Sequence, residues 1–156
     1  MKGNVKIIAK LNDLLSDELT AVNQYMVHAE MAANWGYAKL AEAVEKRAID
    51  EMKHAELHIG RILFLEGIPV VSNLKAIHIG DVVEKQVKND WDAEEGAIKS
   101  YNDGIKLAVE VGDNGTRELM EKILKDEETH IDWIEAQLDQ IKQLGIQNYL
   151  TEQLED

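Results

Sequence analysis

Two short motifs of the same form constrain this chain more than any other feature of its 156 residues. Glu51 is followed three positions later by His54, and Glu127 is followed at the same interval by His130. Residues three apart on an α-helix lie on one face, so each pair can direct a carboxylate and an imidazole to a common point. Two such pairs, with one glutamate from each of two further helices, form the carboxylate-bridged two-metal site of some four-helix bundles.

An internal repeat predicts which two glutamates complete the set. The interval from Glu18 to Glu51 is identical to the interval from Glu94 to Glu127. The chain is therefore interpreted as one helix pair used twice, in which the first helix supplies a single Glu and the second supplies a Glu-x-x-His. The offset that relates Glu18 to Glu94 also relates His54 to His130, Tyr25 to Tyr101 and Gly36 to Gly112.

Composition narrows the class of protein. The chain has no Cys, which argues against disulfides, zinc ribbons, iron–sulfur clusters and thiol catalysis. One Pro and 30% charged residues at helical periodicity favour an all-α fold, in a single domain over residues 1–156. A formal net charge of −13 disfavours nucleic acid and anionic membranes as partners and favours cations. We find no apolar run of membrane-spanning length and no signal peptide, so a cytoplasmic location is expected.

Apolar residues at three- and four-residue steps predict four long helices, with glycine at the turns. The stretch between the second and third helices, residues 70–81, has no sustained period. A connection of that length allows the third helix to run parallel to the second. A short amphipathic tail, residues 146–154, is too small to be stable unless it docks. The prediction is a four-helix bundle with one long crossover and a short fifth C-terminal helix, whose main helices span residues 5–34, 38–66, 82–111 and 116–144.

Acidic residues on the apolar stripes are the informative anomaly. Four unpaired carboxylates inside a bundle would cost many kcal/mol or take up protons. Two divalent ions would cancel four carboxylates, and oxygen-rich ligation with one His per ion suits iron or manganese better than zinc. In the first helix, Glu18 shares a stripe with Ile8, Leu11, Leu15, Leu19, Val22 and Met26. We therefore predict a redox-active two-metal centre whose catalytic and metal-binding residues are Glu18, Glu51, His54, Glu94, Glu127 and His130.

These residues and several longer segments closely resemble bacterioferritin over nearly the whole chain. The segments are Asn23–Tyr25, Asp50–Ala55, Arg61–Gly67, Asp126–Trp133 and the tail Gly145–Leu150. The resemblance implies a ferritin-like fold and a homo-oligomeric shell of 24 subunits, built from two-fold dimers. It implies iron storage, with Fe(II) oxidised by O2 or H2O2 and deposited inside the shell as an Fe(III) mineral.

The resemblance also assigns cofactors. It implies that the six residues form a ferroxidase centre for two Fe ions per subunit, with Glu51 and Glu127 bridging the irons. It implies that Met52 from each of two subunits ligates one shared haem b. Met52 is one residue, about 100°, around the helix from Glu51, and so points away from the bundle core. An iron–sulfur ferredoxin is the partner that the family suggests for iron release.

One departure from the family concerns the inner surface of the shell. Many bacterioferritins carry a His at position 46 beside Asp50, as an inner-surface iron site. Here Lys46 and Arg47 stand in that place, which argues against an iron site at Asp50.

Other residues near the predicted centre leave alternatives open. Tyr25 is interpreted either as a one-electron donor or as a hydrogen-bond donor close to the metals. His58 is predicted to make a polar contact rather than to extend the ligand set. His28 and His78 are predicted to be surface or interface residues.

Two other classes of ferritin-like protein are weighed against this interpretation. A soluble two-iron peroxidase of the rubrerythrin kind usually adds a cysteine-bearing iron module, and Cys is absent here. A DNA-protecting mini-ferritin holds its metals between subunits, whereas six ligands within one chain and an acidic net charge argue against that class. Whether the centre passes iron onward or keeps it as a permanent redox cofactor is left open.

Overall fold

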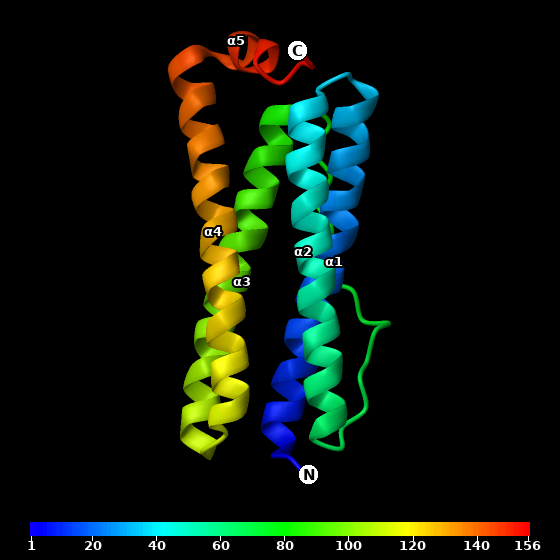
Figure 1. Ribbon diagram of the computed structural model, residues 1–156, viewed down its shortest axis with the longest axis vertical. Coiled ribbons are helices and arrows are strands. Elements are labelled where there is room, and N and C mark those ends of the chain that lie inside the picture. The colour runs from blue at the N-terminus through cyan, green and yellow to red at the C-terminus, as the bar shows by residue number, and fades with distance from the viewer.

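The computed structural model describes residues 1–156 and consists of helices and connecting segments (Figure 1). The α1–α2 pair is antiparallel, as is the α3–α4 pair, and the two pairs pack together along their length. The predicted ferritin-like four-helix bundle is confirmed, including the crossover that makes α3 run parallel to α2. The helices are α1 Val5–Asn34, α2 Ala38–Phe64, α3 Val83–Val111, α4 Asn114–Leu144 and α5 Ile146–Thr151.

Local sequence signals explain where the helices begin and end. The Asn4 side chain accepts a hydrogen bond from the Lys6 amide and caps α1. The Asp113 side chain caps α4 by accepting from the Thr116 amide, so this helix begins two residues earlier than predicted. α3 ends at Val111, and the next residue, Gly112, has a φ of 74°, the left-handed conformation that glycine adopts without steric cost.

α2 ends at Phe64, two residues before the predicted boundary. Glu66, rather than the following glycine, adopts the left-handed conformation, with a φ of 62°. The Gly67 amide then donates to the Ile62 carbonyl and closes the last turn. The prediction placed the end too late because it assigned the stop signal to Gly67.

Residues 65–82 form the crossover and run back along α1 (Figure 1). A row of polar α1 side chains, spaced four positions apart, holds this segment through its backbone. Because residues four apart lie on one face of a helix, the row forms a continuous ladder along α1. Its members are Asn12, which bonds Ile68 and Val70; Ser16, which donates to Asn73; Thr20, which accepts from Lys75; Gln24, which accepts from His78; and His28, which accepts from Gly80.

His28 corrects one prediction. Its side chain is buried rather than at the surface or an interface. Nδ1 donates to Asp90 at 2.8 Å, and Nε2 accepts from the Gly80 amide at 3.0 Å. His28 therefore joins α1 to both α3 and the crossover, whereas His78 is exposed as predicted.

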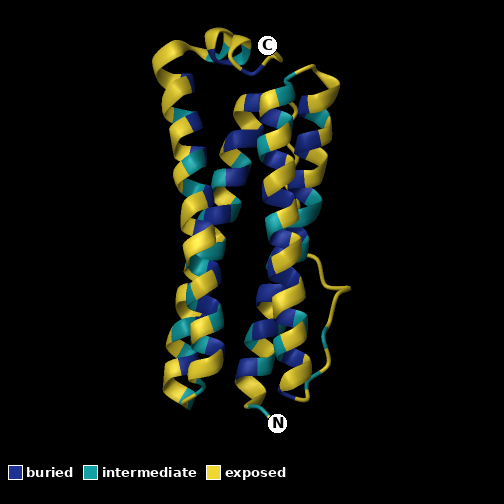
Figure 2. Cartoon of the chain, viewed as in Figure 1, coloured by how far each residue is buried: buried dark blue, intermediate teal, exposed yellow.

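Buried residues follow the inward-facing side of all four long helices (Figure 2), and the apolar ones among them form two separate clusters. On α1, one cluster contains Leu15 and the other begins at Tyr25, with Glu18 between them. On α2, Ala48 and Ala55 belong to opposite clusters and flank the first Glu-x-x-His motif. The apolar packing therefore leaves a polar layer halfway along the bundle. The predicted α1 stripe was wrong at its C-terminal end, since Met26 is 50% exposed and Tyr25 is buried instead.

The C-terminal tail docks across one end of the bundle (Figure 1). Tyr149 is fully buried, and its hydroxyl donates to Gln137 on α4 at 2.8 Å. The Lys39 amide at the start of α2 donates to the Gln153 carbonyl. These contacts supply the docking that a helix as short as α5 requires for stability. No helix has both the length and the apolar character needed to span a bilayer.

Candidate metal centre

The structure brings all six predicted ligand residues together in the polar layer between the two apolar clusters. Each main helix contributes: α1 and α3 supply one glutamate each, and α2 and α4 supply one Glu-x-x-His pair each. All six side chains are buried, with relative exposures of at most 7%. They form two groups of four, in each of which the candidate ligand atoms lie within 4.8 Å of one another.

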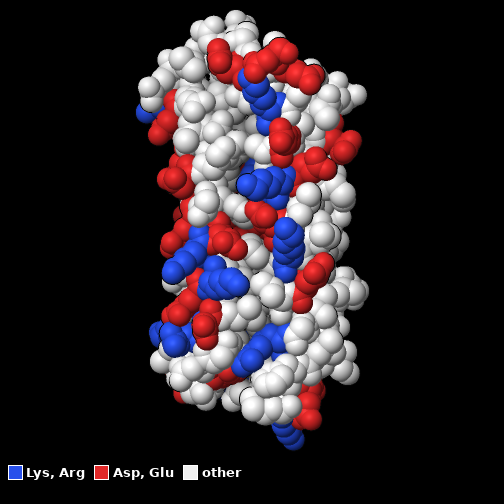
Figure 3. All heavy atoms as spheres, in the orientation of Figure 1, with Lys and Arg blue, Asp and Glu red and all other residues white.

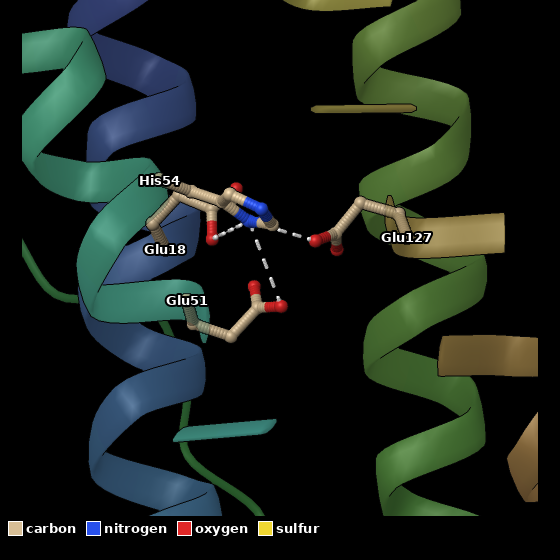
Figure 4. A group of neighbouring side chains, drawn as sticks. All are labelled: Glu18, Glu51, His54 and Glu127. Carbon is tan, nitrogen blue, oxygen red and sulfur yellow. Dashed lines mark ion pairs between the residues drawn. The ribbon is translucent and has the colours of Figure 1, made fainter. Parts of the chain in front are cut away.

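The first group surrounds the His54 imidazole (Figure 4). Its Nδ1 atom lies 3.6 Å from Glu18 Oε2, 3.8 Å from Glu51 Oε1 and 3.0 Å from Glu127 Oε1. The carboxylates reach this nitrogen from α1, α2 and α4, so the group forms only when all three helices are packed.

The second group surrounds the His130 imidazole in the same manner. Its Nδ1 atom lies 3.0 Å from Glu51 Oε1, 3.4 Å from Glu94 Oε1 and 3.8 Å from Glu127 Oε1. Glu51 and Glu127 therefore belong to both groups, while Glu18 and Glu94 each belong to one. This is the arrangement expected of two terminal and two bridging carboxylates.

The hydrogen bonding of the centre fits a pair of cations. Each of the six residues has at least one buried side-chain oxygen or nitrogen without a hydrogen-bond partner, including Nδ1 of both histidines. Buried polar atoms in native proteins are almost always paired. The four carboxylates supply hard oxygen ligands and the two imidazoles supply one nitrogen per group, which matches the preferences of iron or manganese.

The pKa shifts of the metal-free centre also indicate that it needs added positive charge. Burial, together with the neighbouring carboxylates, raises the pKa of Glu51 and of Glu127 well above the usual range. Burial disfavours the His54 imidazolium, but the Glu127 and Glu18 carboxylates outweigh it and raise the pKa of His54 to about 11. Without ions, the centre therefore holds protons at neutral pH in the place of positive charge.

Two aspartates that the ligand prediction missed hold the outer nitrogens of the histidines. His54 Nε2 donates to Asp126 Oδ2 at 2.9 Å, and His130 Nε2 donates to Asp50 Oδ2 at 3.1 Å. Each bond fixes the ring so that Nδ1 faces the carboxylates. The sequence contained the signal, because the two aspartates immediately precede the Glu-x-x-His motifs and are related by the same internal repeat.

Two tyrosines complete the repeat around the terminal glutamates. Tyr25 donates to Glu94 Oε1 at 2.8 Å, and Tyr101 donates to Glu18 Oε1. The hydrogen-bonding role predicted for Tyr25 is confirmed, and its role as an electron donor stays a prediction. His58 makes the predicted polar contact, since its Nε2 lies 2.6 Å from the Tyr101 hydroxyl.

A cavity of about 510 Å³ leads to the centre between α1, α3 and the crossover. Glu18, Glu51 and Glu127 line its inner end, and Asp17, Asp92 and Lys75 are among the residues nearer the surface. The Lys75 ammonium lies 2.5 Å from Asp17 Oδ1 and 2.9 Å from Asp13 Oδ1.

A second cavity, of about 390 Å³, lies between α2 and α4. Its lining includes Lys46, Arg47 and Asp50 from α2, with Asp126 and His130 from α4. Figure 3 shows Lys and Arg side chains among the acidic ones on the face that includes these two helices. The Asp50 carboxylate accepts a hydrogen bond from His130, and Lys46 and Arg47 line the same cavity. This cavity therefore offers basic groups beside a carboxylate that already has a hydrogen-bond partner.

Comparison with known proteins identifies the family. The ferritin-like domain model matches residues 8–144. A bacterioferritin of Brucella melitensis is 39% identical over 149 residues, covering 96% of this chain and 92% of that protein. The chain belongs to the bacterioferritin family. Bacterioferritins of Mycolicibacterium paratuberculosis and Rhodobacter capsulatus are also each 39% identical over 149 residues, covering 96% of this chain and 94% and 92% of those proteins.

Proposed function

We propose that this bacterioferritin-family chain stores iron, and that its buried centre is a ferroxidase that oxidises Fe(II) to Fe(III). One observation carries the proposal: two four-membered ligand groups overlap at Glu51 and Glu127, so two ions can be held side by side by shared carboxylates. The unpartnered buried atoms support bound cations, the donor set suits iron or manganese, and membership of the bacterioferritin family favours iron.

Fe(II) is the substrate, and the residues of the centre bind and orient it. Glu18 and His54 hold one ion, Glu94 and His130 hold the other, and Glu51 and Glu127 lie between them. Each Fe(II) loses one electron. O2 takes up two electrons and two protons to give H2O2, or H2O2 takes up two electrons and two protons to give two molecules of water.

The protein matrix supports this reaction in two ways. The aspartates behind the histidines keep each Nδ1 aimed at its ion. The cavity between α1, α3 and the crossover supplies a route for Fe(II), past Asp92 to the inner glutamates. Carboxylates along such a route raise the local concentration of a divalent cation.

The outer face of α2 supports the haem and assembly proposals. Met52 is 45% exposed, and four other large apolar residues of α2 are also exposed: Ile49, Leu57, Leu63 and Phe64. Exposed apolar side chains beside an exposed thioether fit a haem held between two chains, to which Met52 of each chain would contribute one ligand. A bound haem would supply a one-electron redox group between the chains. We propose the two-fold dimer formed in this way as the building unit of a 24-subunit shell that encloses a ferric mineral.

Loss of a shared ligand tests the ferroxidase proposal. Glu127→Ala should lower the initial rate of Fe(II) oxidation about a thousandfold, since both ions lose a ligand. Stopped-flow absorbance after mixing with Fe(II) in air measures the rate, and Glu128→Ala, which removes an exposed neighbour, is the matched control. Size-exclusion chromatography with light scattering checks that both variants assemble as the wild type does. An unchanged rate in correctly assembled Glu127→Ala would refute the centre.

Substitution of Met52 tests the haem proposal separately. Met52→Leu should remove or shift the Soret band of the purified protein and leave the initial rate of Fe(II) oxidation unchanged. Met26→Leu is the matched control, because it removes a thioether on α1 that is exposed to a similar degree. A Soret spectrum of Met52→Leu identical to that of the wild type would exclude Met52 as the ligand.

A further inference from the structure

The internal repeat breaks at one buried cluster beside the centre. Arg47 on α2 pairs with Asp90 on α3, with Nη2 at 3.0 Å from Oδ2, and both side chains are buried. Their equivalents in the repeat are Ile123 and Leu14, which are also buried. The two halves of the molecule therefore place an ion pair and an apolar contact at equivalent positions.

The Arg47 guanidinium reaches the centre beside Glu94. Its Nη1 atom lies 4.0 Å from Glu94 Oε1, and Nη1 and Nε have no hydrogen-bond partner. The guanidinium lies over the ring of Tyr25, 4.5 Å from the centroid, and 5.4 Å from that of Trp133. These rings and Asp90 confine the cation, so its unpaired edge stays directed at the Glu94 carboxylate.

The corresponding side of Glu18 carries no cation. Glu18 accepts from Tyr101, and the Tyr101 hydroxyl in turn accepts from His58 Nε2, because it has already donated its own hydrogen. Burial lowers the pKa of His58 to about 4, so this imidazole is neutral at physiological pH. The two terminal glutamates thus have equivalent tyrosines but different neighbours beyond them.

We propose that Arg47 makes the two ion positions unequal, so that a first divalent cation binds with Glu18 and His54 and a second fills the Glu94–His130 position. The inference rests on the proposed function, since it assumes that the centre binds two ions. A fixed positive charge near Glu94 repels an incoming cation and competes with it for the carboxylate. Asp90 screens this charge in part, but it bonds Nη2 and leaves Nη1 unpaired.

The order of loading can be measured with cobalt, which requires no turnover. Crystals of the wild-type protein containing about one Co(II) per chain should show anomalous scattering at both positions, with the Glu18–His54 position favoured by about tenfold. Arg47→Gln removes the charge and should bring the two occupancies within about twofold of each other. Arg47→Lys keeps the charge and should retain most of the preference.

A second variant, Asp90→Asn, should strengthen the effect of Arg47 on the two ion positions instead of removing it. Asp90→Asn preserves the shape of the side chain and removes the charge that screens Arg47, so the preference for the Glu18–His54 position should increase. This variant keeps the inference testable if Arg47→Gln does not fold. Arg61→Gln is the matched control, because Arg61 pairs with Asp113 at the α3–α4 turn, away from the centre, and should leave the ratio unchanged.

The outcomes separate the two proposals. Equal occupancy in the wild type, or a preference that neither Arg47→Gln nor Asp90→Asn alters, would overturn the role of Arg47 and leave the metal centre intact. Absence of cobalt at both positions, in crystals soaked to several equivalents, would overturn the proposed function itself.

Discussion

The two helical hairpins, α1–α2 and α3–α4, carry the same ligands but surround them differently. Counterparts in the repeat face each other across the centre, and each half lends its aspartate to the histidine of the other. Outside this set, His58 in one half corresponds to Ile134 in the other. The repeat therefore preserves what would touch the ions, while the environment one layer further out is free to differ and can adjust each position separately.

The largest expected effect concerns His58, whose counterpart in the other half is the apolar Ile134. Its pKa is lowered to about 4 from an ordinary value of 6.5. Between pH 4 and pH 6.5, the His58 imidazole is therefore protonated in the unfolded chain and neutral in the folded chain. Stability of the metal-free protein should therefore fall as pH drops from 6.5 to 4, by about 3 kcal/mol from this residue. His58→Gln can still donate to Tyr101 and should remove that part of the acid sensitivity. Urea unfolding at several pH values measures it.

Two results would bear on this prediction. His78→Gln replaces an exposed histidine and should leave the pH dependence as it is in the wild type. If His58→Gln has the same pH dependence as the wild type, His58 is not the neutral buried group that distinguishes the two halves.

The next largest effect concerns a feature that both halves share, the aspartate that holds each histidine. Asp50→Ala and Asp126→Ala each free one histidine, and each should weaken Co(II) binding about 10- to 100-fold. The Asp126 side chain is 56% exposed and that of Asp50 is 33% exposed, so we expect the smaller loss for Asp126→Ala. Calorimetric titration gives the affinities, and Asp132→Ala, an exposed acid on α4, is the control. Affinities unchanged in both variants would show that the histidines are held without these aspartates.

The smallest effect concerns a feature present in one half only, the polar ladder on α1. Thr20→Val keeps the shape of the side chain but removes the acceptor for the Lys75 amide. Loss of one such bond should lower the free energy of unfolding by about 1 kcal/mol. Hydrogen exchange at Lys75 should accelerate while exchange in the α3–α4 hairpin stays the same. Thr129→Val, whose hydroxyl bonds only within α4, provides the comparison. Unaltered exchange at Lys75 would show that the hydrogen bond from Lys75 to Thr20 does not hold the crossover in place.

The helices and the meeting of the six candidate ligand residues could be predicted from the amino-acid sequence alone. Periodicity predicted the helix boundaries to within two residues, because an apolar stripe has only one way to face a core. The repeated Glu-x-x-His motifs identified residues that the structure does bring together, because four buried glutamates on apolar stripes are tolerable where they can share bound cations. The pairing of the two aspartates was also encoded, by their place in the repeat.

Contacts between elements far apart in the chain emerged only from the packed bundle. Arg47 and Asp90 form one buried pair between α2 and α3, and nothing in either local segment indicates the partner. His28 was misassigned for the same reason: its two partners, Asp90 and Gly80, come from another helix and from an aperiodic segment. Helical periodicity reports the direction of a side chain, whereas a hydrogen bond or an ion pair between distant residues depends on how the helices pack, and packing is settled by the whole chain.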